Sequence, residues 1–219
     1  MTLLRAPEKT CRQIPTNQLP ETALNKINMT GAILAGGQSR RMGFNKAFIS
    51  TGEGAIIERT VRLISSVFKE SFIVANDAAI YKGLGLPVYT DIISGAGSLG
   101  GIYTAIFHSG NNYTFVVACD MPYLDEACVR AVAERTGKAG SVAPFIGGML
   151  HPMHAAYSKR CLTVIEKHIK AGDLMINTLL DEIDTLRLTE DDFPGLPIAR
   201  SVENVNTKDD LRRTGLDGE

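Results

Sequence analysis

The alternation of short apolar runs with amphipathic segments is the feature that most constrains the fold of this chain. The runs GAILA (31–35), SFIVAN (71–76) and YTFVVACD (113–120) are typical of buried strands. Residues 55–68, 99–109 and 125–136 place apolar side chains at helical spacing. Because strands that alternate with helices favour a parallel sheet covered on both faces, the sequence predicts an α/β protein. The expected architecture is a Rossmann-like, three-layer α/β/α fold with a mostly parallel central sheet.

The rest of the chain extends this pattern without dividing it. Residues 140–158 read as two strands joined at Gly147–Gly148, and helices are expected over 159–171 and 174–183. A strand over 201–205 is expected to lead into a helix capped by Thr207. Residues 1–28 are polar and interrupted by prolines, which predicts a poorly ordered tail with Met29 as the natural start. Residues 29–219 are therefore predicted to form a single domain.

Composition narrows the functional classes. The net charge of −1 gives no bulk attraction to nucleic acid or to an anionic membrane. No apolar run approaches the roughly 20 residues that span a bilayer, and the first residues lack the apolar centre of a secretory signal. The 4 cysteines show no C-x-x-C spacing, which fits a reducing compartment. A cytoplasmic protein that binds neither nucleic acid nor membrane is predicted.

The stretch GAILAGGQSRRMGFNK (31–46) combines glycine with positive charge more than any other part of the chain. A strand that ends in two glycines exposes consecutive backbone N–H groups, which form an anion-binding nest. Arg40, Arg41 and Lys46 add charged donors, so a polyphosphate is the expected ligand. The stretch is not a Walker A loop, because Ala47 stands where that loop needs a hydroxyl. A plain surface turn with solvated arginines is the alternative.

A competing motif lies at GAGSLG (95–100), a literal G-x-G-x-x-G with Asp120 about 20 residues further on. Taken alone it would indicate an NAD-binding protein. Two strand–helix units precede it, however, and residues 91–94 separate it from the strand PVYT (87–90). Both features disfavour the first, tight turn of a dinucleotide-binding fold.

Several polar side chains are candidates for chemistry at strand ends. Asp120 follows an apolar strand, where burying a carboxylate is costly unless it is paired or binds a metal ion. Mg²⁺ is the expected ion, because it prefers one or two carboxylates together with phosphate oxygens. The alternative is that Asp120 caps the next helix. Asn204 and Asn206 are two apart and would share one face of a strand. His151 and His154 flank a proline in an expected strand and so would face opposite sides, which argues against a zinc pair.

The motif LAGGQSRRMGFNK resembles the L-A-G-G-x-S-x-R-M-G-x-x-K signature of MobA-like nucleotidyltransferases, and among them the molybdenum cofactor guanylyltransferases. VYTDIISGAGSLGGI, ACDMPYL, LHP and NVNT follow in the family's order, although Ser98 stands where the family has proline. The resemblance implies a catalytic set, a nucleotide-binding set and an acceptor-binding set. The catalytic residues would be Arg41, Lys46 and Asp120, with Asp120 as the Mg²⁺ ligand. The nucleotide would be bound by Leu34, Ala35, Gly36, Gly37, Lys46, Asp91 and Asp120, and the acceptor by His151, Asn204 and Asn206.

The resemblance implies transfer of GMP from GTP to the terminal phosphate of molybdopterin, or of its molybdenum-loaded form, with release of pyrophosphate. Further partners would be the molybdenum-insertion enzyme and apo-molybdoenzymes or their chaperones. Relatives that use CTP typically read L-A-A-G, so Gly36 favours guanine. The alternatives are a CTP-using pterin enzyme, a nucleotidyltransferase with a sugar-phosphate or cobinamide acceptor, and a non-catalytic nucleotide-binding protein.

Overall fold

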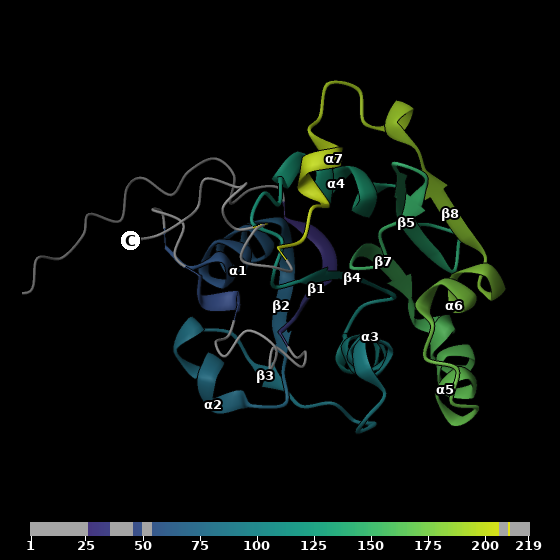
Figure 1. The fold of residues 1–219 in the computed structure, drawn as a ribbon, viewed down its shortest axis with the longest axis horizontal. Coiled ribbons are helices and arrows are strands. Elements are labelled where there is room, and N and C mark those ends of the chain that lie inside the picture. The colour runs from purple at the N-terminus through teal and green to yellow at the C-terminus, as the bar shows by residue number, and fades with distance from the viewer. Residues whose placement is uncertain (1–25, 36–45, 50–53, 206–209, 211–219) are drawn as a thin grey trace, which may run out of the picture.

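The computed structural model describes residues 26–35, 46–49, 54–205 and 210. Its centre is an eight-stranded sheet with the order β3-β2-β1-β4-β7-β5-β6, and β8 pairs with β5 (Figure 1). The strands are β1 (Ile27–Leu34), β2 (Phe68–Val74), β3 (Val88–Tyr89), β4 (Tyr113–Ala118), β5 (Ser141–Ile146), β6 (Met149–Leu150), β7 (His154–Ser158) and β8 (Thr185–Leu188). The first four strands run parallel, whereas β7 is antiparallel to both β4 and β5.

Helices cover both faces of this sheet (Figure 1). They are α1 (Ile56–Val67), α2 (Ala78–Tyr81), α3 (Gly97–His108), α4 (Glu126–Glu134), α5 (Leu162–Lys170), α6 (Ile176–Glu182) and α7 (Ile198–Ser201). Short 3-10 turns occur at η3 (Lys46–Phe48), η4 (Lys82–Leu84), η5 (Lys159–Cys161) and η6 (Glu190–Asp192). The predicted α/β class with a mostly parallel central sheet is confirmed.

The alternation of side chains along β1 creates two cores. Ile33 packs in one core with residues of α1 and α4, whereas Ala32 and Leu34 pack in the other with residues of α3, α5 and α6. Successive side chains of a strand point to opposite faces, so a strand that is apolar throughout must be covered on both sides. Each core is completely enclosed at its centre, since Ile33 and Ala32 are both 0% exposed. This makes β1 a rigid base for the loop that follows Ala35.

The topology brings the ends of four strands to one edge. Because β1, β2, β3 and β4 are parallel, residues that follow them meet at the carboxyl edge of the sheet, where ligands bind in open α/β folds. The hydrogen bond from the backbone N–H of Cys119 to the carbonyl of Leu34 (3.1 Å) joins the ends of β1 and β4 directly.

Three local expectations differ from the structure. The strand predicted over 201–205 is wrong: Ser201 ends α7, and residues 203–205 have no regular structure. The region predicted as two strands over 140–158 contains three, because a turn at 151–153 separates β6 from β7. β1 begins at Ile27 and so includes two residues assigned to the tail; the rest of that tail and the Thr207 cap lie outside the described residues.

Candidate active site

The end of β1 is held from two sides. Leu34 and Ala35 are both buried, and the carbonyl of Ala35 accepts a hydrogen bond from the hydroxyl of Tyr81 in α2 (2.7 Å). The ring of Tyr81 stacks on Phe48, which lies on η3 at the far end of the glycine-rich stretch. Both ends of that stretch are thus fixed to the same tyrosine, although no local sequence signal identifies Tyr81 because it lies 46 residues from Ala35.

Several predicted residues of this loop lie outside the described part of the chain. They are Gly36, Gly37, Arg40 and Arg41, and the same holds for the side chain of Lys46 and for Asn206. Their assigned roles stay predictions.

Asp91 follows β3 and is paired with Asn76, which follows β2. The amide nitrogen of Asn76 donates to Oδ2 of Asp91 (2.8 Å), and the backbone N–H of Asp91 donates to Oδ1 of Asn76 (3.3 Å). This two-point contact fixes the carboxylate at the carboxyl edge. Sequence reasoning did not single out Asn76, although its place directly after a predicted strand was the available signal.

The loop after Asp91 leads into α3 rather than into the first helix of the fold. The motif at 95–100 follows β3, a two-residue strand at the edge of the sheet. Ala96, Gly97 and Ser98 line a shallow cavity of about 330 Å³ together with residues 174–177. A dinucleotide fingerprint belongs to the first strand–helix turn, so this placement disfavours the NAD-binding alternative.

Asp120 lies two residues beyond β4, with its Oδ1 atom buried. Its carbonyl accepts a hydrogen bond from the backbone N–H of Val205 (3.0 Å). The cap of α4 is Asp125, whose Oδ1 accepts from the backbone N–H of Cys128 (3.0 Å). The alternative in which Asp120 caps this helix is therefore wrong.

The two aspartates at the carboxyl edge follow strands that are not neighbours in the sheet. Asp91 follows β3 and Asp120 follows β4, which are three places apart in the sheet, about 14 Å at the usual strand spacing. A hard divalent cation that keeps water and substrate phosphate ligands needs only one or two protein carboxylates. Asp120 alone fits that requirement, and within the described residues no cluster of three or more His, Cys, Asp or Glu side chains could hold a metal.

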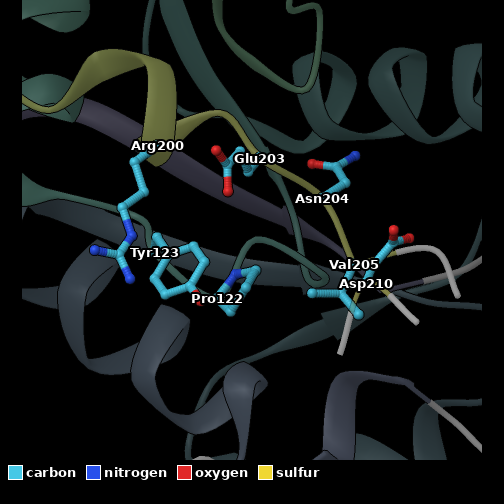
Figure 2. A pocket seen from close by; sticks show the side chains of 7 residues that line it. All are labelled: Pro122, Tyr123, Arg200, Glu203, Asn204, Val205 and Asp210. Atoms are coloured by element: carbon cyan, nitrogen blue, oxygen red, sulfur yellow. The ribbon is translucent and has the colours of Figure 1, made fainter. Parts of the chain in front are cut away.

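A cavity of about 520 Å³ opens beside Asp120, between the loop after β4 and the segment after α7. We call it the α7 pocket. Figure 2 shows the residues that line it: Pro122, Tyr123, Arg200, Glu203, Asn204, Val205 and Asp210. Among the predicted acceptor residues, Asn204 lines this pocket. His151 lies in the turn before β7, with Nε2 3.3 Å from the carbonyl of Ile146, and is not among the lining residues.

A buried polar chain anchors α7 beneath the pocket. The hydroxyl of Ser201 accepts a hydrogen bond from the backbone N–H of Asp125 (3.1 Å) and lies 3.2 Å from Nε2 of His154. Burial disfavours the charged imidazole and lowers the pKa of His154 to about 4. His154 is therefore neutral near pH 7 and links β7 to α7 without introducing a buried charge.

The described part of the site is typical of a nucleotide-binding α/β transferase: the central strand β1 leads into the glycine-rich stretch at the carboxyl edge of the sheet, where Asp91 and Asp120 follow the parallel strands β3 and β4. The profile of the MobA-like NTP transferase domain matches residues 31–186, and the chain belongs to this family of nucleotidyltransferases. Enzymes of this class use a divalent metal ion.

Similar proteins of known name agree with this assignment. The chain is 34% identical over 188 residues to a molybdenum cofactor guanylyltransferase of Desulfosudis oleivorans, covering 84% of this chain and 93% of that one. It is 36% identical over 191 residues to a probable molybdenum cofactor guanylyltransferase of Aquifex aeolicus, covering 87% and 92%. The crystal structure of molybdopterin-guanine dinucleotide biosynthesis protein A from Archaeoglobus fulgidus shares the fold, with a TM-score of 0.73, 23% identity and coverage of 84% and 96%.

Proposed function

We propose that the protein transfers GMP from GTP to the terminal phosphate of molybdopterin, or of its molybdenum-loaded form, and releases pyrophosphate. One observation carries the proposal: the start of the glycine-rich loop and Asp120 lie together at one sheet edge, joined by the hydrogen bond between Cys119 and Leu34. Relatives that match most of the chain are named molybdenum cofactor guanylyltransferase, which supports GMP transfer as the reaction.

The reaction needs positioning and charge neutralisation more than protein nucleophiles. An oxygen of the acceptor phosphate attacks the α-phosphorus of GTP, and the bond from that phosphorus to the bridging oxygen breaks as pyrophosphate leaves. The attacking phosphate is already ionised near neutral pH, so no general base is required. Asp91, fixed by Asn76, is the proposed nucleotide contact on the β3 side of the loop.

The backbone N–H groups of Gly36 and Gly37, with Arg41 and Lys46, are the proposed ligands of the triphosphate. Charge on these groups stabilises the departing pyrophosphate. Asp120 would hold Mg²⁺, which neutralises phosphate charge in the transition state when bound. The acceptor is assigned to the side of Asp120 that carries Asn204, with His151 and Asn206 as further proposed contacts.

Delivery partners follow from the product. A dinucleotide cofactor must pass to the proteins that use it, so we propose contacts with the molybdenum-insertion enzyme and with apo-molybdoenzymes or their chaperones.

Within the described residues, no helix is long and apolar enough to cross a bilayer. Consumption of GTP fits the cytoplasmic location predicted from the sequence.

Calorimetric titration with GTP, CTP and NAD, each with and without Mg²⁺, tests the nucleotide half of this proposal. We expect saturable binding of GTP that tightens with Mg²⁺, and at least about tenfold weaker binding of CTP, a difference of about 1.4 kcal/mol. Preference for CTP would keep the chemistry but change the transferred base. Binding of NAD and of neither triphosphate would overturn the proposal.

A further inference from the structure

The α7 pocket contains an arginine held in a fixed orientation by an aromatic ring. The guanidinium carbon of Arg200 lies 4.0 Å from the ring centroid of Tyr123. At this distance the planar cation is attracted to the face of the ring, which favours one orientation of an otherwise flexible side chain. Within the described part of the chain, Arg200 forms no ion pair with a carboxylate. No described carboxylate therefore competes with a ligand for its N–H donors.

Glu203 supplies the opposite chemistry in the same pocket. It follows α7 by two residues, it is exposed, and its carboxylate makes no hydrogen bond or ion pair to another described residue. Figure 2 shows Arg200 and Tyr123 toward one end of the pocket, Val205 and Asp210 toward the other, and Glu203 and Asn204 between them, with Asn204 nearer Val205. The pocket thus combines a flat cationic donor stacked on an aromatic ring at one end with a carboxylate acceptor further along the same wall.

The two ends of the pocket differ in their distance from the proposed reaction centre, because the Val205 end is hydrogen-bonded to Asp120. The hydrogen bond from the N–H of Val205 to the carbonyl of Asp120 puts that end beside the proposed phosphoryl-transfer centre. An acceptor that fills this pocket with its phosphate at the Val205 end extends its opposite end toward Arg200. In a phosphorylated pterin, that opposite end is the 2-amino-4-oxopyrimidine ring.

We propose that Arg200, held on Tyr123, and Glu203 recognise the 2-amino-4-oxopyrimidine edge of the acceptor and so determine acceptor specificity. This inference rests on the proposed function. The edge carries two adjacent N–H donors and one carbonyl acceptor. Glu203 accepts both N–H groups through its two oxygens, and Arg200 donates to the carbonyl oxygen. A bound ligand covers these exposed groups, and a mismatched ligand would leave them covered but unpaired, which favours the matching edge.

The first test is binding of 6-hydroxymethylpterin, followed by its own fluorescence. The protein is first saturated with Mg²⁺ and the α,β-methylene analogue of GTP, because guanine presents the same hydrogen-bonding edge and its site must be filled. Lumazine, which has a carbonyl in place of the 2-amino group, serves as the mismatched ligand. The wild type is expected to prefer the pterin to the lumazine by at least about tenfold, or about 1.4 kcal/mol.

Substitutions of Glu203 and Arg200 test which residue causes the preference for pterin over lumazine. Glu203→Gln is expected to weaken pterin binding at least about tenfold and to remove most of the preference over lumazine. Arg200→Ala is expected to weaken both ligands, and Arg200→Lys to restore binding only in part because its ammonium lacks the planar fork. The matched control is Arg187→Ala. Arg187 also lies over an aromatic ring, Phe145, at 6.0 Å, but on β8 and outside the pocket.

Turnover gives an independent measure. In GMP transfer to molybdopterin, Glu203→Gln and Arg200→Ala are expected to raise the KM for the acceptor at least about tenfold while leaving the KM for GTP within about twofold. Wild-type KM values for molybdopterin in both variants would overturn this inference and leave the proposed function intact. Equal binding of pterin and lumazine by a wild type that still transfers GMP would do the same. Failure of the wild type to bind the GTP analogue would overturn the proposed function and this inference with it.

Discussion

At the scale of single residues, two aspartates in one loop separate catalysis from stability. Asp120→Ala is expected to lower GMP transfer at least about 100-fold, because it removes the proposed metal ligand, while the melting temperature stays close to that of the wild type. Asp125→Ala removes the cap on the N–H of Cys128 and is expected to lower the free energy of unfolding by about 1 kcal/mol with transfer retained. Transfer rates over a Mg²⁺ titration, with thermal melts of both variants, check the pair. Near-normal turnover by Asp120→Ala would remove this residue from the metal site.

His154 gives the molecule a predicted sensitivity to acid. Its pKa is lowered by burial from 6.5 to about 4, so the unfolded chain binds a proton more readily than the folded one. The stabilisation is fully present above pH 6.5 and is lost as the pH falls from 6.5 to about 4, at a cost of about 3 kcal/mol. Urea unfolding at pH 7, 5.5 and 4.5 should therefore show a steeper loss of stability for the wild type than for His154→Gln, which cannot titrate. Parallel pH profiles would contradict the prediction.

At the scale of secondary-structure elements, Gly31 sets how closely α1 packs on β1. A Cβ atom at this position would lie 2.5 Å from Cγ2 of Ile64 and 2.6 Å from Cδ2 of Phe68, both buried. Gly31→Ala is expected to lower the free energy of unfolding by about 1–3 kcal/mol, because the helix or the ring must shift. Gly137→Ala is the control, since nothing lies within 4 Å of its Cβ position. Equal unfolding free energies for the two variants would show that β1 and α1 are not in such close contact.

The elements also show what could be predicted from the sequence. The helices expected over 55–68, 99–109 and 125–136 correspond to α1, α3 and α4, because strong apolar periodicity reports burial locally. The strand expected over 201–205 failed because the buried valines 202 and 205 are three apart, which suits a helical turn better than a strand. β8 was not predicted: its alternation of polar and apolar residues spans only four positions, two of which are exposed, and it pairs with β5 at a distance in sequence.

The candidate site was predictable only where a strand end marked it. Asp91 and Asp120 both follow predicted strands, so parallel topology was enough to bring them to one edge. Tyr81 and Arg200 act through contacts with residues distant in sequence, Ala35 and Tyr123, and neither contact leaves a local pattern. The placement of α7 likewise depends on the buried contact between Ser201 and His154, 47 residues apart.

At the scale of the whole molecule, the start of the folded domain can be tested by truncation. Met29 is the predicted natural start, yet β1 begins at Ile27, which pairs with Phe68, and Met29 itself is buried. For a chain that begins at Lys26 after its initiator methionine, we expect a free energy of unfolding within about 0.5 kcal/mol of that of the full chain, and equal affinity for GTP. A chain beginning at Met29 loses the Ile27 contacts and carries its α-amino charge on a buried strand residue. We expect its free energy of unfolding to be lower by about 1–3 kcal/mol. Each kcal/mol corresponds to a fall in melting temperature of about 2–4 °C for a chain of this size. Equal melting temperatures for the two truncated chains would contradict this and support Met29 as the domain boundary.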